Sequence, residues 1–100
     1  MRETSQTIHR WGRETFGEAR SVRTYALRAR EELEELIEAI EKDESSESIL
    51  AEAADVTILL HRLAASLNSD LSDAVDQKMG MNRRRTWTKS GDGVGQHKAE

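Results

Sequence analysis

The sequence has no cysteine and no proline, and only four of its 100 residues are aromatic. Without cysteine there is neither a disulfide framework nor thiol chemistry. The absence of proline is typical of long uninterrupted helices, and so few aromatic residues argue against a β-sandwich. No segment approaches the roughly 20 apolar residues of a membrane span, and the N-terminus lacks the apolar core of a signal peptide. These absences predict a helical, cytoplasmic protein with no membrane partner.

Charge is abundant instead. Charged residues make up 34% of the chain and hydrophobic residues 36%, with a formal net charge of −4. This balance suits a helical protein with polar outer faces, and the length suits one domain, which we place at 1–100. A domain of this size has a thin core, so burial against a second copy would help it.

Apolar residues recur at helical spacing in four segments, at about 4–16, 21–42, 47–67 and 71–82. The third segment has the widest apolar stripe, so we expect it to lie centrally. In the fourth we expect four residues to face inward, namely Leu71, Ala74, Val75 and Met79. Residues 86–100 form a polar, glycine-rich tail that is either disordered or ordered by a ligand or a partner subunit. The sequence therefore predicts an all-α fold of four helices.

Two of the predicted helices carry carboxylates three residues apart, Glu32 with Glu35 and Glu52 with Asp55. This spacing puts each pair on one helix face, and antiparallel packing would bring all four together. Such a group of oxygen ligands suits Mg²⁺ or Mn²⁺. Glu52 and Asp55 lie among apolar residues, where a buried carboxylate needs a partner or a metal. On the earlier helix acidic residues cover most of the circumference, so a solvated acidic face explains that pair equally well.

Basic residues gather near the C-terminus, where Lys78, Asn82 and Arg85 follow at steps of four and three. If the fourth helix continues past Gly80, the three share a face that could bind phosphate, ribose or a base edge. The alternative is a helix end rich in cations, which the helix dipole favours. A nucleic-acid patch fits the net negative charge less well, so we expect no stable nucleic-acid partner.

The order of these motifs resembles one protein family. The pattern E-E-x-x-E at 31–35, followed after sixteen residues by E-x-x-D at 52–55, resembles the MazG-like all-α nucleoside triphosphate pyrophosphohydrolases. The block K-M-x-x-N-x-x-R-x-W at 78–87 is similar to a third motif of that family. The segments WGRETFG and GDGVGQH, at 11–17 and 91–97, are most similar to a phage and bacterial branch of dATP/dGTP diphosphohydrolases.

The resemblance implies a MazG-like four-helix bundle completed by dimerisation, and a specific reaction. Water would attack the α-phosphorus of a (deoxy)nucleoside triphosphate, preferably a purine one, with Mg²⁺ or Mn²⁺ as cofactor and pyrophosphate as leaving group. Glu32, Glu35, Glu52 and Asp55 would match the metal-binding positions. Glu31 would take part in catalysis as a supporting group.

The resemblance also implies the substrate contacts and the assembly. Lys78, Asn82 and Arg85 would match the residues that bind phosphate and sugar. Trp11 is a candidate for stacking on the base, the alternative being a plain core tryptophan. The enzyme would be a homodimer or homotetramer with sites completed across its interface. The competing function is a non-catalytic helical interaction module, which would explain the amphipathic helices and the charge but not the isolated Glu52 and Asp55.

Overall fold

The computed structural model describes residues 2–88 and 91–97. Four helices make up most of it: α1 (Ser5–Phe16), α2 (Val22–Glu41), α3 (Ser46–Ser66) and α4 (Leu71–Arg84). A short antiparallel ribbon follows, formed by β1 (Trp87–Thr88) and β2 (Gln96–His97). The predicted all-α fold is confirmed, and each helix begins and ends within two residues of the predicted limit. Among the described helices, none combines the length and apolar character needed to cross a membrane.

Local chemistry explains where these helices begin and end. Ser45 and Asp70 precede α3 and α4, and their side chains accept hydrogen bonds from backbone N–H groups of the first turns. Ser21 stands at the same position before α2, but its hydroxyl makes no capping hydrogen bond. Gly17 ends α1 with a φ of 85°, a conformation that glycine adopts without a steric penalty. Gly80 does not interrupt α4.

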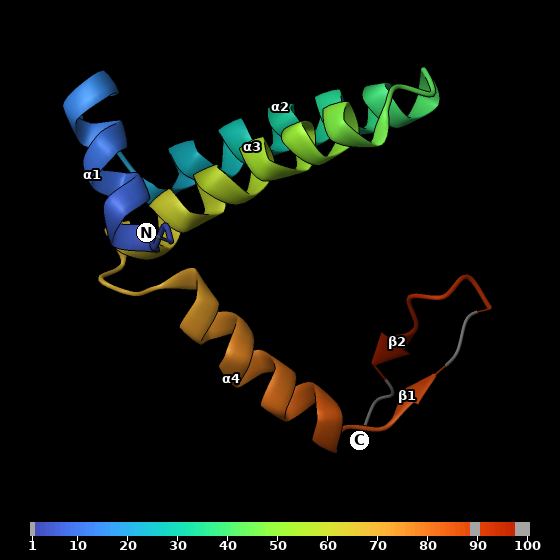
Figure 1. The fold of residues 1–100 in the computed structure, drawn as a ribbon. Coiled ribbons are helices and arrows are strands. Elements are labelled where there is room, and N and C mark those ends of the chain that lie inside the picture. The colour runs from blue at the N-terminus through green and yellow to red at the C-terminus, as the bar shows by residue number, and fades with distance from the viewer. Residues whose placement is uncertain (1, 89–90, 98–100) are drawn as a thin grey trace.

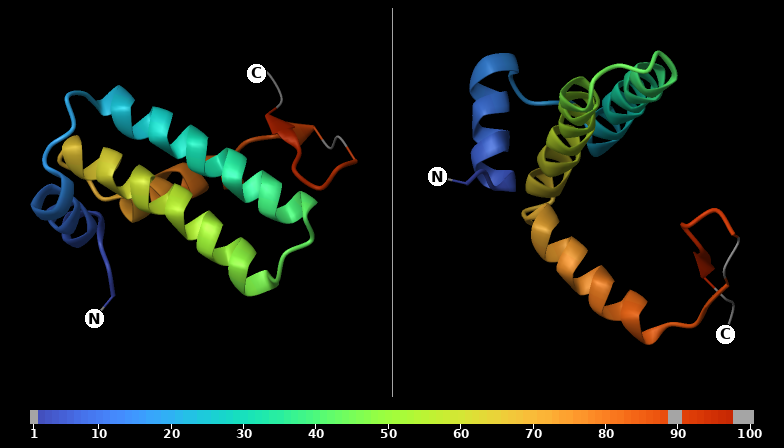
Figure 2. Two further views of the ribbon diagram at one scale, coloured as in Figure 1. Left: turned by 90° about the horizontal axis from the view of Figure 1, so that it is seen from above. Right: turned by 45° about the vertical axis from the view of Figure 1, so that its right-hand side comes forward.

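The helices are arranged around a long antiparallel pair formed by α2 and α3 (Figures 1 and 2). Helix α1 packs against α3, and α4 leaves the end of α3 and diverges from the pair. Helix α3 thus contacts all three other helices, which confirms its predicted central position. The α2–α3 pair and α4 enclose an open concave side instead of a closed bundle (Figure 1).

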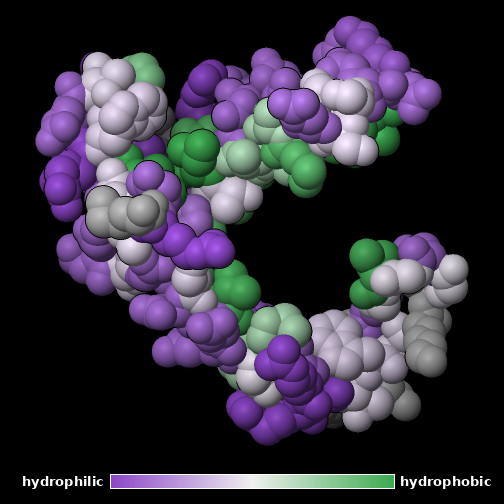
Figure 3. Space-filling view, viewed as in Figure 1, coloured by the Kyte–Doolittle hydropathy of each residue, from purple (hydrophilic) through white to green (hydrophobic). Residues whose placement is uncertain are grey.

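The core of the single chain is thin. Among residues 2–88 and 91–97, only five apolar residues are buried, and four of them are alanines: Tyr25, Ala29, Ala39, Ala64 and Ala65. Helix α4 buries none of its residues, and Val75 is 50% exposed, so the prediction that its apolar residues face inward is wrong for the single chain. The reason is the divergence of α4. Figure 3 shows hydrophobic side chains along the concave side, where a large apolar surface has no cover within the chain.

The C-terminal tail is more regular than its composition indicated. Trp87 pairs with His97 and Thr88 with Gln96, so the described part of the tail folds back as a two-stranded ribbon. Three glycines in the connection have positive φ, namely Gly91, Gly93 and Gly95. The Trp87 indole N–H donates to the carbonyl oxygen of Asn82 at 2.8 Å. This ribbon was not predicted, and residues 89–90 and 98–100 of the predicted tail lie outside the described residues.

Candidate functional site

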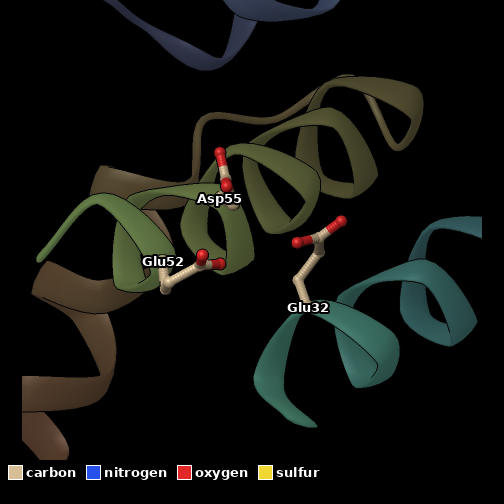
Figure 4. A group of neighbouring side chains, drawn as sticks. All are labelled: Glu32, Glu52 and Asp55. Atoms are coloured by element: carbon tan, nitrogen blue, oxygen red, sulfur yellow. The ribbon is translucent and has the colours of Figure 1, made fainter. Parts of the chain in front are cut away.

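Three carboxylates from two helices meet on the α2–α3 pair (Figure 4). Glu32 of α2 lies opposite Glu52 and Asp55 of α3, and one oxygen of each residue lies within 4.8 Å of the others. Two oxygens that each bind one Mg²⁺ at about 2.1 Å can be at most about 4.2 Å apart, so the observed spacing is close to what a single ion of this size needs. Small side-chain movements would let the three carboxylates share one divalent cation. Helical spacing places Glu52 and Asp55 on one face, and antiparallel packing places Glu32 against them.

The other two acidic residues of the predicted site lie beside this cluster. Glu35 shares a hydrogen bond with Glu32, but its oxygens are not part of the three-residue group. Glu31 is exposed and forms an ion pair with Arg28. The structure thus brings together three of the four predicted metal ligands, with the fourth adjoining them. Their binding of a metal stays a prediction.

The electrostatics of the cluster favour a cation. The pKa of Glu32 is raised, first by its hydrogen bond with Glu35, then by burial and by the charges of Glu35 and Asp55. The pKa of Glu52 is raised mainly by burial, with the charges of Glu35 and Asp55 adding to the effect. In the described part of the chain, Oε2 of Glu52 is buried without a hydrogen-bond partner. A divalent ion would relieve both the repulsion and the missing interaction, so these residues fit Mg²⁺ or Mn²⁺.

Arg28 links this cluster to its surroundings and was missed by the sequence analysis. Its guanidinium contacts Glu31 and lies 3.6 Å from Oε1 of Glu32, and its charge lowers the pKa of Glu32 against the other influences. The signal was present in the sequence, because Arg28 and Glu32 are four residues apart on one helix. Because Arg28 lies in a dense run of charged residues, this pairing did not stand out from the others.

A pocket of about 300 Å³ adjoins the cluster. It is lined by Phe16, Gly17, Glu18, Ala19, Thr24, Tyr25, Arg28, Leu59 and Arg62. The Arg62 guanidinium lies over the Tyr25 ring, with Cζ 4.9 Å from the ring centroid. Its Nε donates to Nδ1 of His9 at 3.3 Å, and its Nη2 donates to the carbonyl oxygen of Gly17 at 3.4 Å. Nothing in the sequence pattern indicated a buried arginine here.

The basic residues of α4 do not join the carboxylates within the chain. The helix continues through Gly80, so Lys78 and Asn82 share a face as predicted. Arg85 is the C-cap of the helix: its N–H still donates to the carbonyl oxygen of Asn82, at 3.2 Å, and its ψ of 156° turns the chain that follows. Its place on the face of Lys78 and Asn82 stays a prediction. Because α4 diverges from the α2–α3 pair, its C-terminal half is separated from the carboxylates of the same chain (Figure 1).

Trp11 is not a core residue, since it is 56% exposed on α1. Its ring meets that of Phe16 edge-on, with the centroids 5.5 Å apart. It also lines a second pocket of about 400 Å³ together with Ile8 and Ile58. The alternative of a plain core tryptophan is therefore wrong for the single chain, and the stacking of Trp11 on a base stays a prediction.

A serine, a histidine and an aspartate that are far apart in the sequence meet where α1, α3 and α4 join. The Ser5 hydroxyl lies 2.7 Å from Nδ1 of His61 and accepts a hydrogen bond from the Leu71 N–H at 2.8 Å. The Ser5 N–H donates to Oδ2 of Asp70 at 3.2 Å. Ser5 has no exposed surface, so a substrate cannot reach its hydroxyl. The group holds the helices together, and His61 is half-buried, as expected.

A solved structure resembles the chain over almost its whole length. It is described as the Cyanophage S-2L MazG-like pyrophosphohydrolase bound to dGDP and three catalytic Mn²⁺ ions per active site. The TM-score is 0.72 at 28% sequence identity, and the match covers 95% of this chain and 93% of that chain. Searches against protein-family models and curated proteins found no match. The likeness therefore extends to the acidic helix pair, to α4 and to the tail.

Proposed function

We propose, from the premise that this chain is a MazG-like protein, that it is a nucleoside triphosphate pyrophosphohydrolase. It would convert (deoxy)nucleoside triphosphates, preferably purine deoxynucleotides, to the monophosphate and pyrophosphate. The observation that carries the proposal is the group formed by Glu32, Glu52 and Asp55, in which one buried carboxylate oxygen has no hydrogen-bond partner among the residues that the structure describes. The purine preference is supported by the similar phage protein, which binds dGDP.

Glu32, Glu52 and Asp55 would hold divalent cations, Mg²⁺ or Mn²⁺, and Glu35 would add a ligand from the same turn as Glu32. When bound, such cations neutralise the phosphate oxygens and favour attack of water on the α-phosphorus. Glu31 would support the site indirectly, because its ion-pair partner Arg28 also contacts Glu32. Trp11 would stack on the base from the exposed face of α1.

A second copy of the chain would complete the site, as a homodimer or homotetramer. The uncovered apolar surface gives such an assembly its driving force, since Leu50 is 68% and Ile40 54% exposed. The proposed phosphate-binding block consists of Lys78 and Asn82 on α4 and Arg85 at its C-terminal end, and α4 diverges from the carboxylates of its own chain. We propose that this block reaches the carboxylates of a neighbouring subunit.

A product assay tests the reaction. The protein is incubated with each of the eight common nucleoside and deoxynucleoside triphosphates and Mg²⁺ or Mn²⁺, and the products are identified by phosphorus NMR. We expect pyrophosphate instead of orthophosphate, with oxygen from ¹⁸O-water entering the monophosphate, as attack on the α-phosphorus requires. Glu52→Gln and Asp55→Asn should abolish this release without loss of helicity, whereas Glu47→Gln, an exposed carboxylate of the same helix, should leave it unchanged.

Full turnover in both site variants would refute the assignment of the carboxylates. Binding of another protein to the exposed apolar surface, without any hydrolysis, would favour the competing function, a non-catalytic helical interaction module. The exposed apolar residues are consistent with such a module. Strong, salt-dependent DNA binding without hydrolysis would instead implicate the cationic end of α4. The cytoplasmic location expected from the sequence stays a prediction.

A further inference from the structure

Helix α4 is held to the rest of its own chain at its N-terminal end. It buries none of its residues, and it diverges from the α2–α3 pair (Figure 1). The connection before it is tied to the end of α3, because the Ser69 N–H donates to the carbonyl oxygen of Ala64 at 3.0 Å. The direction of α4 within the chain therefore depends on the contacts of the next two residues, Asp70 and Leu71.

Asp70 and a residue of α1, Ser5, bind the N-terminal ends of α1 and α4 to each other. Oδ1 of Asp70 accepts from the Ser72 N–H of α4 at 2.9 Å, and Oδ2 accepts from the Ser5 N–H of α1 at 3.2 Å. In return, the Ser5 hydroxyl oxygen accepts from the Leu71 N–H at 2.8 Å. N–H groups in the first turn of a helix have no partner within that helix, so each of these two helices receives an acceptor from the other.

The Ser5 hydroxyl also connects these helix ends to α3. It lies 2.7 Å from Nδ1 of His61, which follows Asp55 by six residues on α3. Ser5 has no exposed surface, so water cannot take the place of these hydrogen bonds, and a lost partner would leave a buried polar group unsatisfied. The angle of α4 is thereby fixed against the helix that carries two of the three clustered carboxylates.

We propose that Ser5, His61 and Asp70, hereafter the α4 junction, are positioning residues that place the proposed phosphate-binding block at the carboxylates. The inference rests on the proposed function and adds residues on which the same site depends. Asn82 lies eleven residues after Leu71, about 16 Å along α4, so a tilt of about 10° at the α4 junction would move it by about 3 Å. A displacement of about 1 Å in a positioned group can cost on the order of 100-fold in rate.

Two substitutions weaken the α4 junction with little change in volume. Asp70→Asn keeps one oxygen that can cap α4, but it places an amide NH₂ where an oxygen accepts from the Ser5 N–H. Ser5→Ala removes the acceptor of the Leu71 N–H. The matched control is Ser45→Ala, which removes the hydroxyl that caps α3 outside the α4 junction and should lower the melting temperature to a similar extent.

The direction of α4 is measured by electron spin resonance as the distance between two spin labels. Glu41→Cys at the end of α2 and Arg83→Cys near the end of α4 provide exposed attachment sites, and the sequence has no cysteine that would compete. Labelled protein is diluted with unlabelled protein so that only distances within one chain are recorded. Binding of Mn²⁺ alone, and of inorganic pyrophosphate with Mn²⁺ present, is measured by calorimetry.

We expect one narrow distance distribution in the labelled wild type and in Ser45→Ala, and a broadened or shifted distribution in Asp70→Asn and Ser5→Ala. Pyrophosphate binding should weaken at least about ten-fold in the two junction variants alone. Mn²⁺ affinity should stay at the wild-type value throughout, because the carboxylates lie on α2 and α3. A merely structural role would lower stability without changing the distances or separating the two affinities.

The inference is overturned if both junction variants keep the wild-type distances, or if Ser45→Ala changes the distances equally. It is also overturned if pyrophosphate affinity does not follow the distances, or if Mn²⁺ affinity falls as far as pyrophosphate affinity. Triphosphate hydrolysis by the wild type together with unchanged distances in the variants would refute the α4 junction alone. The expected distances and affinities in a protein that hydrolyses no triphosphate would refute the proposed function alone, because neither measurement needs turnover.

Discussion

Gly12 of α1 lies against the guanidinium of Arg62 on α3, so closely that a Cβ at position 12 would be 2.4 Å from Nε and 2.5 Å from Cζ. On its other side the guanidinium covers the Tyr25 ring. The buried arginine is therefore enclosed by α1 and α2, and it joins the three helices at the wall of the pocket. Only a residue without a side chain lets α1 approach α3 at this point.

Gly12→Ala should therefore destabilise the protein. The added methyl group displaces Arg62 or separates α1 from α3, and overpacking of this kind costs about 1–3 kcal/mol. Thermal unfolding followed by circular dichroism measures the loss. Gly80→Ala is the matched control, because the nearest atom to its Cβ is 3.7 Å away, and alanine should stabilise α4 by about 0.5–1 kcal/mol. A Gly12→Ala protein that melts at or above the wild-type temperature would contradict the close contact.

The stability of the protein should fall in acid partly through Asp70. Backbone N–H groups of Ser72 and Ser5 donate to this carboxylate and lower its pKa. A group whose pKa is lower in the folded state contributes stability above its unfolded pKa, and the contribution is lost as the pH falls through the folded pKa. Asp70→Asn should therefore reduce the fall of the urea unfolding midpoint as the pH is lowered into the acid range.

Asp73→Asn, a change in the same first turn of α4, serves as the control for that measurement and should keep the wild-type acid limb. The assignment fails if the two variants have the same pH dependence.

The negative charge of Glu52 should lower the melting temperature of the metal-free protein, whereas a bound metal should raise it. The raised pKa of Glu52 means that its ionised form is disfavoured in the folded, metal-free protein. The folded protein therefore loses stability as the pH rises from the pKa of Glu52 in the unfolded chain to its pKa in the folded protein. Glu52→Gln should therefore raise the melting temperature in EDTA at neutral pH. Mn²⁺ should raise the melting temperature of the wild type, because only the folded state holds the ligands together, and this increase should be lost in the variant.

The same scan on Glu47→Gln controls for the general effect of removing a negative charge from α3. A wild-type protein whose melting temperature does not respond to Mn²⁺ or Mg²⁺, with nucleotide absent and present, would refute the metal site.

Two inactive variants should restore activity to one another if subunits share their sites. Glu52→Gln removes a carboxylate of the cluster and Lys78→Ala removes a cation that we propose binds phosphate, and each homo-oligomer should be inactive. Mixed oligomers, formed by unfolding and refolding the two together, would contain some sites with both native residues. We expect partial pyrophosphate release from the mixture. No recovery, with mixed oligomers confirmed by native mass spectrometry, would place both residues in one subunit's site.

The interface itself can be tested on α4. Val75→Lys places a charge in the exposed apolar surface, whereas Gln77→Lys makes a matched change at an exposed polar position of the same helix. Light scattering should show a shift toward the monomer for Val75→Lys alone, because a buried unpaired charge opposes association. An unchanged mass for Val75→Lys would exclude this face from the interface.

What the sequence by itself determined is local. The limits of the four helices follow from apolar spacing, from caps such as Asp70 and from Gly17, because hydrogen bonds within a helix connect residues only a few positions apart. The same reason explains why Glu52 and Asp55 share a face. The length of the chain likewise indicated a thin core, which the few small buried residues confirm.

What only the tertiary structure decided depends on how the helices cross. The grouping of Glu32 with Glu52 and Asp55, the burial of Arg62 against Gly12, and the meeting of Ser5 with His61 each require contacts between residues far apart in the chain. The divergence of α4 could not be predicted from the sequence either. An apolar stripe indicates that a helix face will be covered, but it does not identify the element or subunit that covers it. Helical periodicity is a property of one segment, whereas the packing of two helices depends on the side chains of both.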